Sequence, residues 1–411
     1  MVKTAENALL ESFTHPIRDV LWGHVYMTEK MALLTESAPF NKLTRILQLG
    51  PVYHVYPGAT HTRASHSIGV YHLGLRLLHN LAEKGASGWL SYQGVKSFLA
   101  ACLLHDLGHF PYTHSLKDLS LTDHETLTGK IIKEEPIKSL VGAAGADPDL
   151  TAAIVDKDLP ANDTEVLFYR KLLSGALDPD KLDYLNRDAR YCGVPYGAQD
   201  VDFILSRLQP HKERGADIDS RLIPNVESIL FSKYLMYRTV YWHKQVRAAT
   251  AMIKKALING MESGKISPAE LYNHDDHSLF ALLKDSGLAQ SVREGRIFTA
   301  ASEFPYDQDK LKPIKDFELR TRLEEQMAKE LGVEELIIDL PEPASFETGL
   351  YVTDEKCGFS ESSSAFKTET VNAFIQTLYT IRIFTDQKYK DTLKTSRQIY
   401  DIFINLINRG F

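Results

Sequence analysis

The sequence contains few cysteines and no long apolar run. Cys102, Cys192 and Cys357 are the three cysteines among 411 residues, and no two of them form a C-x-x-C pair. This scarcity argues against a disulfide framework or a zinc ribbon. No apolar run approaches the roughly 20 residues that cross a bilayer, and the first residues, MVKTAENALLESF, lack the apolar core of a signal peptide. We therefore expect a cytoplasmic protein without a membrane partner.

A basic excess is also absent. The chain carries 47 lysines and arginines against 54 aspartates and glutamates, which gives a formal net charge of −7. This balance argues against bulk binding of nucleic acid, although it leaves room for a local basic pocket. With 44% hydrophobic and 25% charged residues, the composition is that of an ordinary globular protein. The length predicts two or three domains, or one large domain with an appendage.

Helical periodicity dominates the first 295 residues. His66, Val70 and Leu77 fall on one face of a helix that begins near residue 66. Gly85 follows where this helix is expected to end. Further helices are expected over about 94–107, 180–192, 226–262 and 267–295.

The pattern changes after residue 295. A helix is expected at 319–331, and a last helix at 395–411 closes the chain. The polar segment 358–370 is expected to be a mobile loop. Short β-branched and aromatic stretches predict strands at 296–304, 335–341, 349–354 and 377–386. The predicted fold is therefore mainly α, with a helical domain over 1–295 and a smaller α+β appendage over 296–411.

The stretch LAACLLHDLGHFPYTH, residues 99–114, carries an unusual cluster. An apolar helix ends there in His105 and Asp106, and a buried Asp is rare unless it is paired or binds a metal. His66 opens a second helix on its apolar face, and Asp180 lies at the start of a third. Three helix ends can meet over one cavity, where imidazole and carboxylate groups would converge on a divalent metal.

Each of these residues also has an ordinary interpretation. A single histidine on an apolar face, such as His66, is usually a satisfied core residue, and Asp180 alone fits the N-cap of its helix. His109 follows His105 by four residues, so the two could share a helix face and form a different site. Gly108 is expected to end the helix at that point, which favours the first set.

Four motifs occur in order along the chain, namely TRASHS at 62–67, HDLGHFPYTH at 105–114, DHE at 123–125 and DPDKLDYLNRD at 178–188. Together they resemble the HD-domain phosphohydrolases, most closely the deoxynucleoside triphosphate triphosphohydrolase branch that includes the bacterial dGTPases. The resemblance covers about residues 15–290, and the α+β appendage resembles the family only loosely. It implies an all-helical HD-domain core and a homo-oligomer, either a dimer or a tetramer.

The resemblance also implies a metal-dependent reaction that cleaves a dNTP into a deoxynucleoside and inorganic triphosphate. The divalent metal could be Fe, Mn, Zn, Ni or Mg. Its implied ligands are the set that the helix ends suggest, His66, His105, Asp106 and Asp180. The implied residues of the catalytic centre are His109, His114 and His124, with Glu125 as a carboxylate that can orient a ring.

Cleavage requires a proton for the leaving 5′ oxygen, and the sequence does not choose among the three histidines. Lys117 stands where the mammalian relative has an aspartate three residues after the histidine equivalent to His114. A His–Asp dyad therefore needs Asp118 or Asp123 as a substitute.

Substrate-binding residues follow from the same resemblance. Arg63 and Lys181 flank metal ligands in sequence, and cations are needed around a triphosphate. The implied phosphate ligands are Arg63, Lys181 and Lys233. The implied contacts to the sugar and base are Asp188 and Tyr241 at the 3′ hydroxyl, Tyr184 beside the sugar, Leu49 with Tyr241 against the 2′ carbon, and Gln48 at the base edge. We expect a nucleotide substrate and consider a nucleotide effector, because several relatives need one nucleotide to activate cleavage of another.

Two alternatives remain at this point. One is an HD-domain phosphohydrolase that acts on a nucleoside monophosphate or a cyclic nucleotide. The other is a catalytically silent nucleotide-binding regulator, against which the intact ligand quartet argues.

Overall fold

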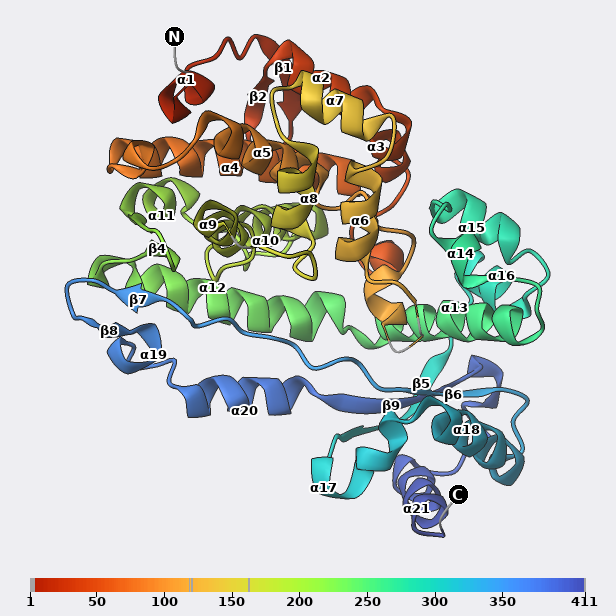
Figure 1. Ribbon diagram of the computed structural model, residues 1–411. Helices are drawn as coiled ribbons and strands as arrows, with labels where there is room; N and C mark the ends of the chain where they lie inside the picture. Colours follow the sequence, from red (N-terminus) through yellow and green to blue (C-terminus); the bar gives the residue numbers. More distant parts are fainter. Residues whose placement is uncertain (1–3, 118, 120, 162, 410–411) are drawn as a thin grey trace.

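The computed structural model describes residues 4–117, 119, 121–161 and 163–409 of the chain. Figure 1 shows a larger helical body, formed by the N-terminal part of the chain, above a smaller unit that contains the C-terminus. The structure confirms the predicted mainly helical fold, with a helical core and small sheets in the C-terminal region.

The helical body contains sixteen described helices. The first eleven are α1 (Ala5–Leu9), α2 (Glu29–Glu36), α3 (Ala38–Leu43), α4 (Arg63–Glu83), α5 (Tyr92–Leu104), α6 (His124–Ile132), α7 (Ile137–Ala143), α8 (Pro148–Val155), α9 (Thr164–Leu173), α10 (Pro179–Cys192) and α11 (Val201–Arg207). The others are α12 (Ile223–Met236), α13 (Lys244–Glu262), α14 (Pro268–Leu271), α15 (Asp276–Leu282) and α16 (Gly287–Arg293). Within the described part of the chain, no helix is both long and apolar enough to cross a membrane.

Two antiparallel hairpins interrupt the helices of the body, and the sequence analysis does not predict either. The first joins β1 (His15–Asp19) to β2 (Gly23–Met27). The second joins β3 (Gln209–His211) to β4 (Gly215–Asp217). The first hairpin matters for the site, because Asp19 at the end of β1 reaches the centre of the body.

Helices α4, α5 and α10 pack closely at the centre because α4 has glycines where it touches the other two helices. A Cβ atom on Gly74 of α4 would lie 2.6 Å from the sulfur of Cys102 in α5. A Cβ atom on Gly69 would overlap a carboxylate oxygen of Asp183 in α10. Glycine is therefore the residue that lets α4 approach both neighbours without displacing them.

Side-chain caps fix where these three helices begin. Thr62 accepts from the backbone N–H of Ser65 at the start of α4, and Ser91 caps α5 in the same way. At α10 the N-cap is Asp178, which accepts from the backbone N–H of Lys181. Asp180 is thus free of the capping role and lies in the first turn of α10.

The single helix predicted over 226–262 is wrong, because the structure breaks it. α12 ends at Met236, a π-helical turn covers Tyr237–Tyr241, and α13 begins at Lys244. The break leaves no clear mark in the sequence, since the apolar periodicity continues on both sides. Such turns occur often at functional sites, and this one places Tyr241 in the wall of the main cavity.

The C-terminal unit contains a three-stranded antiparallel sheet in the order β5 (Thr299–Pro305), β9 (Thr380–Thr385), β6 (Leu336–Asp339). Because side chains alternate along a strand, Ile337 and Phe384 pack with residues of α13, while Ile338 and Ile383 face the other side. That other side is covered by two helices, α18 (Phe317–Leu331) and α21 (Ser396–Asn408). A short helix, α17 (Gln308–Leu311), follows β5.

The chain between β6 and β9 returns to the helical body. Residues 340–350 have no regular secondary structure and run beside α12 (Figure 1). The predicted strand at 349–354 is reduced to β7 (Tyr351–Val352), which pairs with β8 (Cys357–Gly358) outside the main sheet. The loop predicted at 358–370 is also corrected, since it contains α19 (Phe359–Ser362) and the start of α20 (Thr368–Leu378). Phe359 and Phe366 are buried there and order the segment.

Candidate functional site

A cavity of about 620 Å³ lies where the ends of α4, α5 and α10 meet. Its wall includes the segment 46–52, the junction of α12 and α13, and part of the 340–350 segment. Of the sixteen predicted site residues, Lys233 alone does not line it. The other fifteen are Gln48, Leu49, Arg63, His66, His105, Asp106, His109, His114, His124, Glu125, Asp180, Lys181, Tyr184, Asp188 and Tyr241.

Helix termini bring the candidate metal ligands together. His66 lies in the first turn of α4, His105 directly follows α5, and Asp180 lies in the first turn of α10. The Nε2 atom of His66 is 2.9 Å from an Asp180 oxygen, and His105 Nε2 is 3.7 Å from the same oxygen. One ligand atom each from His66, His105 and Asp106 fall within 4.8 Å of one another.

The donor atoms of this cluster fit a divalent cation. His105 Nδ1 is 3.0 Å from the carbonyl of Cys102, so Nδ1 donates and Nε2 presents its lone pair. That Nε2 is buried and has no hydrogen-bond partner among the described residues. His66 Nδ1 lies 2.9 Å from Asp183, so its Nε2 lone pair would face an Asp180 oxygen, and a proton or a cation must lie between two such acceptors.

A second layer of residues holds His66 in place, and the sequence analysis misses it. Asp183 lies one turn after Asp180 and accepts from His66, from the Trp22 indole at 2.6 Å and from Arg187 at 2.8 and 2.9 Å. Arg187 also pairs with Asp19 at 2.9 Å. Asp183 and Arg187 are fully buried. Their spacing of four residues along α10 is the sequence signal that could have revealed the pair.

The charges around the cluster favour a bound cation. Burial lowers the pKa of His66, but hydrogen bonds to Asp180 and Asp183 outweigh it and raise that pKa to about 10. Burial likewise opposes ionisation of Asp106, yet His105 and Arg63 hold its pKa below the ordinary value. The pKa of Asp180 is also held well below its usual range, by the neighbouring His105 and His66 imidazoles. Both carboxylates are therefore ionised at neutral pH.

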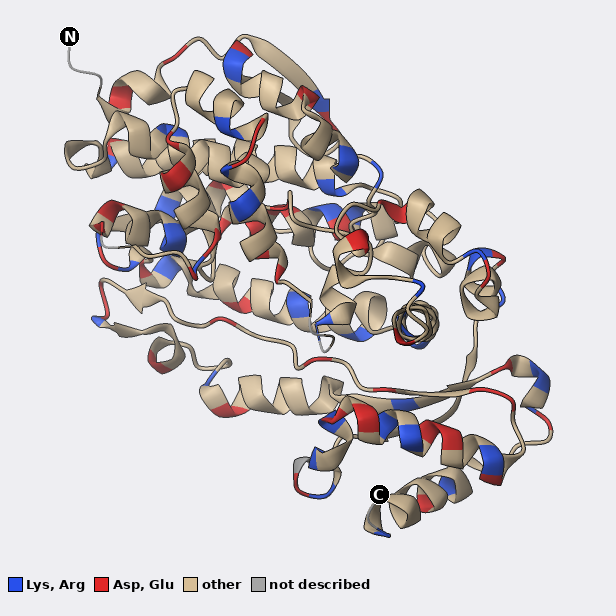
Figure 2. Ribbon diagram, turned by 45° about the vertical axis from the view of Figure 1, so that its right-hand side comes forward, with Lys and Arg blue, Asp and Glu red and all other residues tan. Residues whose placement is uncertain are grey.

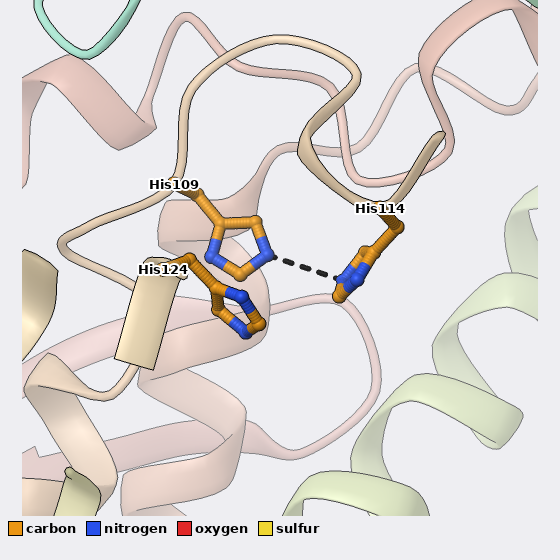
Figure 3. Close-up of side chains that lie close together, drawn as sticks. All are labelled: His109, His114 and His124. Atoms are coloured by element: carbon orange, nitrogen blue, oxygen red, sulfur yellow. Dashed lines mark hydrogen bonds between the residues drawn. The ribbon is translucent and has the colours of Figure 1, made fainter. Parts of the chain in front are cut away.

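Three further histidines form a second group in the same cavity (Figure 3). The Nε2 atoms of His109 and His114 are 3.2 Å apart, and the rings of His109 and His124 have centroids 4.1 Å apart. His109 is buried and His114 is exposed. Desolvation by the surrounding protein lowers the pKa of both well below the ordinary value, and the Arg63 charge and the neighbouring histidines lower them further. His109 Nδ1 lies 3.2 Å from Asp106, which links the two groups.

Besides Asp106, the described carboxylate that contacts this second group is Asp123, not Glu125. Asp123 lies 3.5 Å from His124 Nδ1, and this contact holds the pKa of Asp123 below its ordinary value. Glu125 lines the cavity, but its carboxylate faces Lys157 at 3.5 Å. Among the described residues no carboxylate forms an ion pair with His114, and Asp118 lies outside the described residues.

The three predicted phosphate ligands place positive charge beside the metal cluster and in the region of Asp178 and Glu347. Arg63 donates to Asp106 at 2.8 Å, so it lies directly beside the metal cluster. Lys181 donates to Asp178 at 2.8 Å. Lys233 is buried and donates to Glu347 at 3.0 Å. Glu347 comes from the 340–350 segment, and the sequence analysis gave it no role.

The predicted sugar contacts form a connected polar set. Asp188 accepts from the Tyr241 hydroxyl at 2.6 Å and lies 2.8 Å from His61 Nε2. His61 is a further residue that the sequence analysis does not predict. Tyr184 lies one turn before Asp188 on α10 and lines the cavity. The buried side-chain oxygen of Gln48 has no partner among the described residues, so it can accept a hydrogen bond from a ligand.

Family comparison matches an HD domain to residues 63–186 and an HD-associated region to residues 201–403. The chain contains an HD domain followed by an HD-associated region. The HD domain supplies the metal cluster and the three-histidine group, and the HD-associated region supplies Lys233, Tyr241 and Glu347. The domain boundary predicted between 295 and 296 stays a prediction.

Three other proteins are similar to this chain in sequence or in structure. An uncharacterised protein of Mycoplasma pneumoniae is 33% identical over 54% of this chain and 55% of its own length. The deoxynucleoside triphosphate triphosphohydrolase SAMHD1 of Homo sapiens is 25% identical over 62% of this chain and 46% of its own length. The chain thus spans about half the length of these curated relatives. The crystal structure of a hypothetical protein from Aquifex aeolicus superposes with a TM-score of 0.71, at 25% identity, covering 94% of this chain and 99% of that one.

Proposed function

We propose that this chain is a metal-dependent phosphohydrolase that cleaves a dNTP into a deoxynucleoside and inorganic triphosphate. The observation that carries the proposal is the shared cavity, where a cation-binding cluster, neutral histidines and flanking cations lie together. The 25% identity to a protein named as a deoxynucleoside triphosphate triphosphohydrolase supports the choice of substrate.

His66, His105, Asp106 and Asp180 would hold the cation, which would supply Lewis-acid polarisation of a phosphate group. Arg63 and Lys181 would bind the phosphate oxygens from both sides of this cluster. One histidine of the second group, His109, His114 or His124, would provide the proton for the leaving 5′ oxygen. A neutral imidazole has one free nitrogen that can take up a proton; the ring would take up this proton, for example from the attacking water, and give it to the leaving oxygen as an imidazolium.

The Asp188–Tyr241 pair would bind the 3′ hydroxyl of the sugar, and Leu49 with Tyr241 would leave no space for a 2′ hydroxyl. Gln48 would meet the base edge. If this assignment holds, dATP and dGTP are hydrolysed much faster than ATP and GTP under the same conditions. Equal rates for the ribonucleotides would contradict the sugar assignment without affecting the metal cluster.

The products decide between this reaction and an ordinary phosphatase. All dNTPs and rNTPs are incubated with the metal-loaded protein, singly and in pairs, and early products are followed by phosphorus NMR. We expect inorganic triphosphate and a deoxynucleoside. Orthophosphate with dNDP would favour a different phosphohydrolase, and bound nucleotide without turnover would favour a silent regulator. The pairs test the nucleotide effector, which stays a prediction, as does the homo-oligomer.

A further inference from the structure

A carboxylate stands between the cavity and one of the predicted phosphate ligands. Lys233 does not line the cavity, whereas Glu347 does. The Glu347 carboxylate lies 3.0 Å from the ammonium group of Lys233 and 3.9 Å from that of Lys181. An oxygen anion therefore already occupies the position where these two lysines would meet a phosphate.

The backbone around Glu347 is held against the helical body. Ala344, Phe346 and Leu350 are buried in the core of that body. Lys233 lies over the Phe346 ring, with its ammonium 5.5 Å from the ring centroid. Acidic positions mark this extended segment in Figure 2, where it passes beside α12. Rotation of the Glu347 side chain, rather than movement of the whole segment, would therefore open the lysine pair.

The charge balance explains why Glu347 occupies this place. Lys181 has a second carboxylate partner, Asp178. Within the described part of the chain, Glu347 is the single ion-pair partner of Lys233, and a buried ammonium group needs a counter-charge. The two lysines hold the pKa of Glu347 below its ordinary value against the effect of burial, so the carboxylate stays ionised. A phosphate could replace it as the counter-charge of both lysines.

We propose that Glu347 is an internal competitor, which occupies the subsite of Lys181 and Lys233 until a polyphosphate chain displaces it. The inference rests on the proposed function for the identity of that chain. It has a consequence for product release, because Glu347 returns to the lysines as the triphosphate leaves. A single phosphate held at the metal cluster would not reach this subsite and would leave Glu347 in place.

The test is binding of inorganic tripolyphosphate to the metal-loaded protein, measured by calorimetry. We expect Glu347→Gln to lower the dissociation constant about tenfold, the typical contribution of one charge-assisted contact. Glu342→Gln is the matched control, since it removes the same charge from the same segment and cavity and should change binding less than about twofold. Orthophosphate is the matched ligand and should gain no affinity from Glu347→Gln.

Two additional variants make the result specific. In a Lys233→Met background, Glu347→Gln should give no gain, because the subsite has lost its buried cation. Ser345 donates a hydrogen bond to Glu347 at 2.9 Å. Ser345→Ala removes this hydrogen bond from the Glu347 carboxylate but keeps the ion pair between Glu347 and Lys233. It should strengthen tripolyphosphate binding about twofold to threefold even if Glu347→Gln proves unstable. Equal gains for Glu342→Gln or for orthophosphate, or a gain that persists without Lys233, would overturn the inference.

Different experimental outcomes would contradict the inference about Glu347 and the proposed function. Wild-type protein that hydrolyses dNTPs to triphosphate, with unchanged tripolyphosphate binding in Glu347→Gln and Ser345→Ala, contradicts the competitor alone. Protein that hydrolyses no dNTP, but binds tripolyphosphate more tightly in both variants, contradicts the substrate assignment and supports the competitor.

Discussion

The two histidine groups of the cavity lie side by side but experience opposite electrostatic surroundings. His66 and His105 face Asp106, Asp180 and Asp183, and the pKa of each is raised because these carboxylates outweigh burial. The pKa values of His109, which is buried, and of His114, which is exposed, are lowered instead, by desolvation first and then by neighbouring cationic groups that include Arg63. The same side chain is thus favoured in its protonated form in one group and stays a neutral imidazole in the other.

This difference shows how one cavity can separate the binding of a cation from the transfer of a proton. A cation-binding group needs surrounding negative charge, whereas a histidine that exchanges a proton near neutral pH must not be fixed in its charged form. Arg63 contributes to both conditions, since it pairs with Asp106 and also raises the positive potential at His109 and His114. Variants in the two groups should therefore have separable effects.

The largest effect is expected from Asp106→Ala, which removes a candidate metal ligand. The variant should lose detectable activity and most of the bound metal while staying folded, because the remaining ligands leave the cation under-coordinated. Elemental analysis measures the metal, and circular dichroism the fold. Asp149→Ala, a change at an exposed position in the first turn of α8, is the control. Full metal content in Asp106→Ala would contradict the ligand assignment.

The next effect tests the neutral group. His114→Gln should lower kcat about 10²- to 10⁴-fold, the usual contribution of a positioned proton donor or acceptor, while metal content remains that of the wild type. The exposed His15→Gln supplies the same chemical change outside the cavity. If His114→Gln also lost its metal, as is expected of Asp106→Ala, the two histidine groups would not have separate roles. An unchanged kcat would transfer the proton-donor role to His109 or His124.

A smaller effect is expected from Asp183→Asn, which acts on the metal cluster through His66. The carboxylate fixes the ring orientation, and loss of such a contact typically weakens metal binding 10- to 100-fold. Trp22→Phe, which removes another hydrogen bond to Asp183 but keeps its charge, should have a weaker effect. Because Asp183→Asn also removes a partner of buried Arg187, the unfolding temperature is measured in parallel. Metal affinity equal to that of the wild type would show that His66 needs no orienting carboxylate.

Much of the fold and of the cavity wall could be predicted from the sequence, because local signals carry that information. The helix ends at His66, His105 and Asp180 follow from apolar periodicity and from stop residues such as Gly108. The break at Tyr237–Tyr241 could not be predicted, since a π-helical turn has no distinct periodicity. The hairpin that brings in Asp19 was missed because its strands are short and largely exposed.

The residues that sequence reasoning missed act through contacts between distant parts of the chain. Trp22 is 161 positions from Asp183, and Glu347 is 114 positions from Lys233. No spacing rule within one helix reports such pairs. Lys233 could be named as a cation of the site, but only the structure reveals that a carboxylate from the 340–350 segment already meets it.

The smallest expected effect, taken per pH unit, is the pH dependence of metal binding, and it compares the two groups directly. His66 has a pKa raised to about 10 in the metal-free protein, above its ordinary value, so it is protonated at pH 7.5. Metal binding requires its Nε2 lone pair and must release that proton. Affinity should therefore rise with pH by about tenfold per unit between pH 7 and 9. The ionised carboxylates Asp106 and Asp180 release none, and the already neutral His109 and His114 contribute none.

Proton release is measured by calorimetry at pH 7.5 in buffers of different ionisation enthalpy. About one proton should leave His66 for each metal bound. His114→Gln should give the wild-type number, because that ring carries no exchangeable positive charge before binding. Release well below one proton would mean that His66 is neutral in the metal-free protein. The carboxylates would then not outweigh burial, and the electrostatic difference between the two groups would be much smaller than the structure indicates.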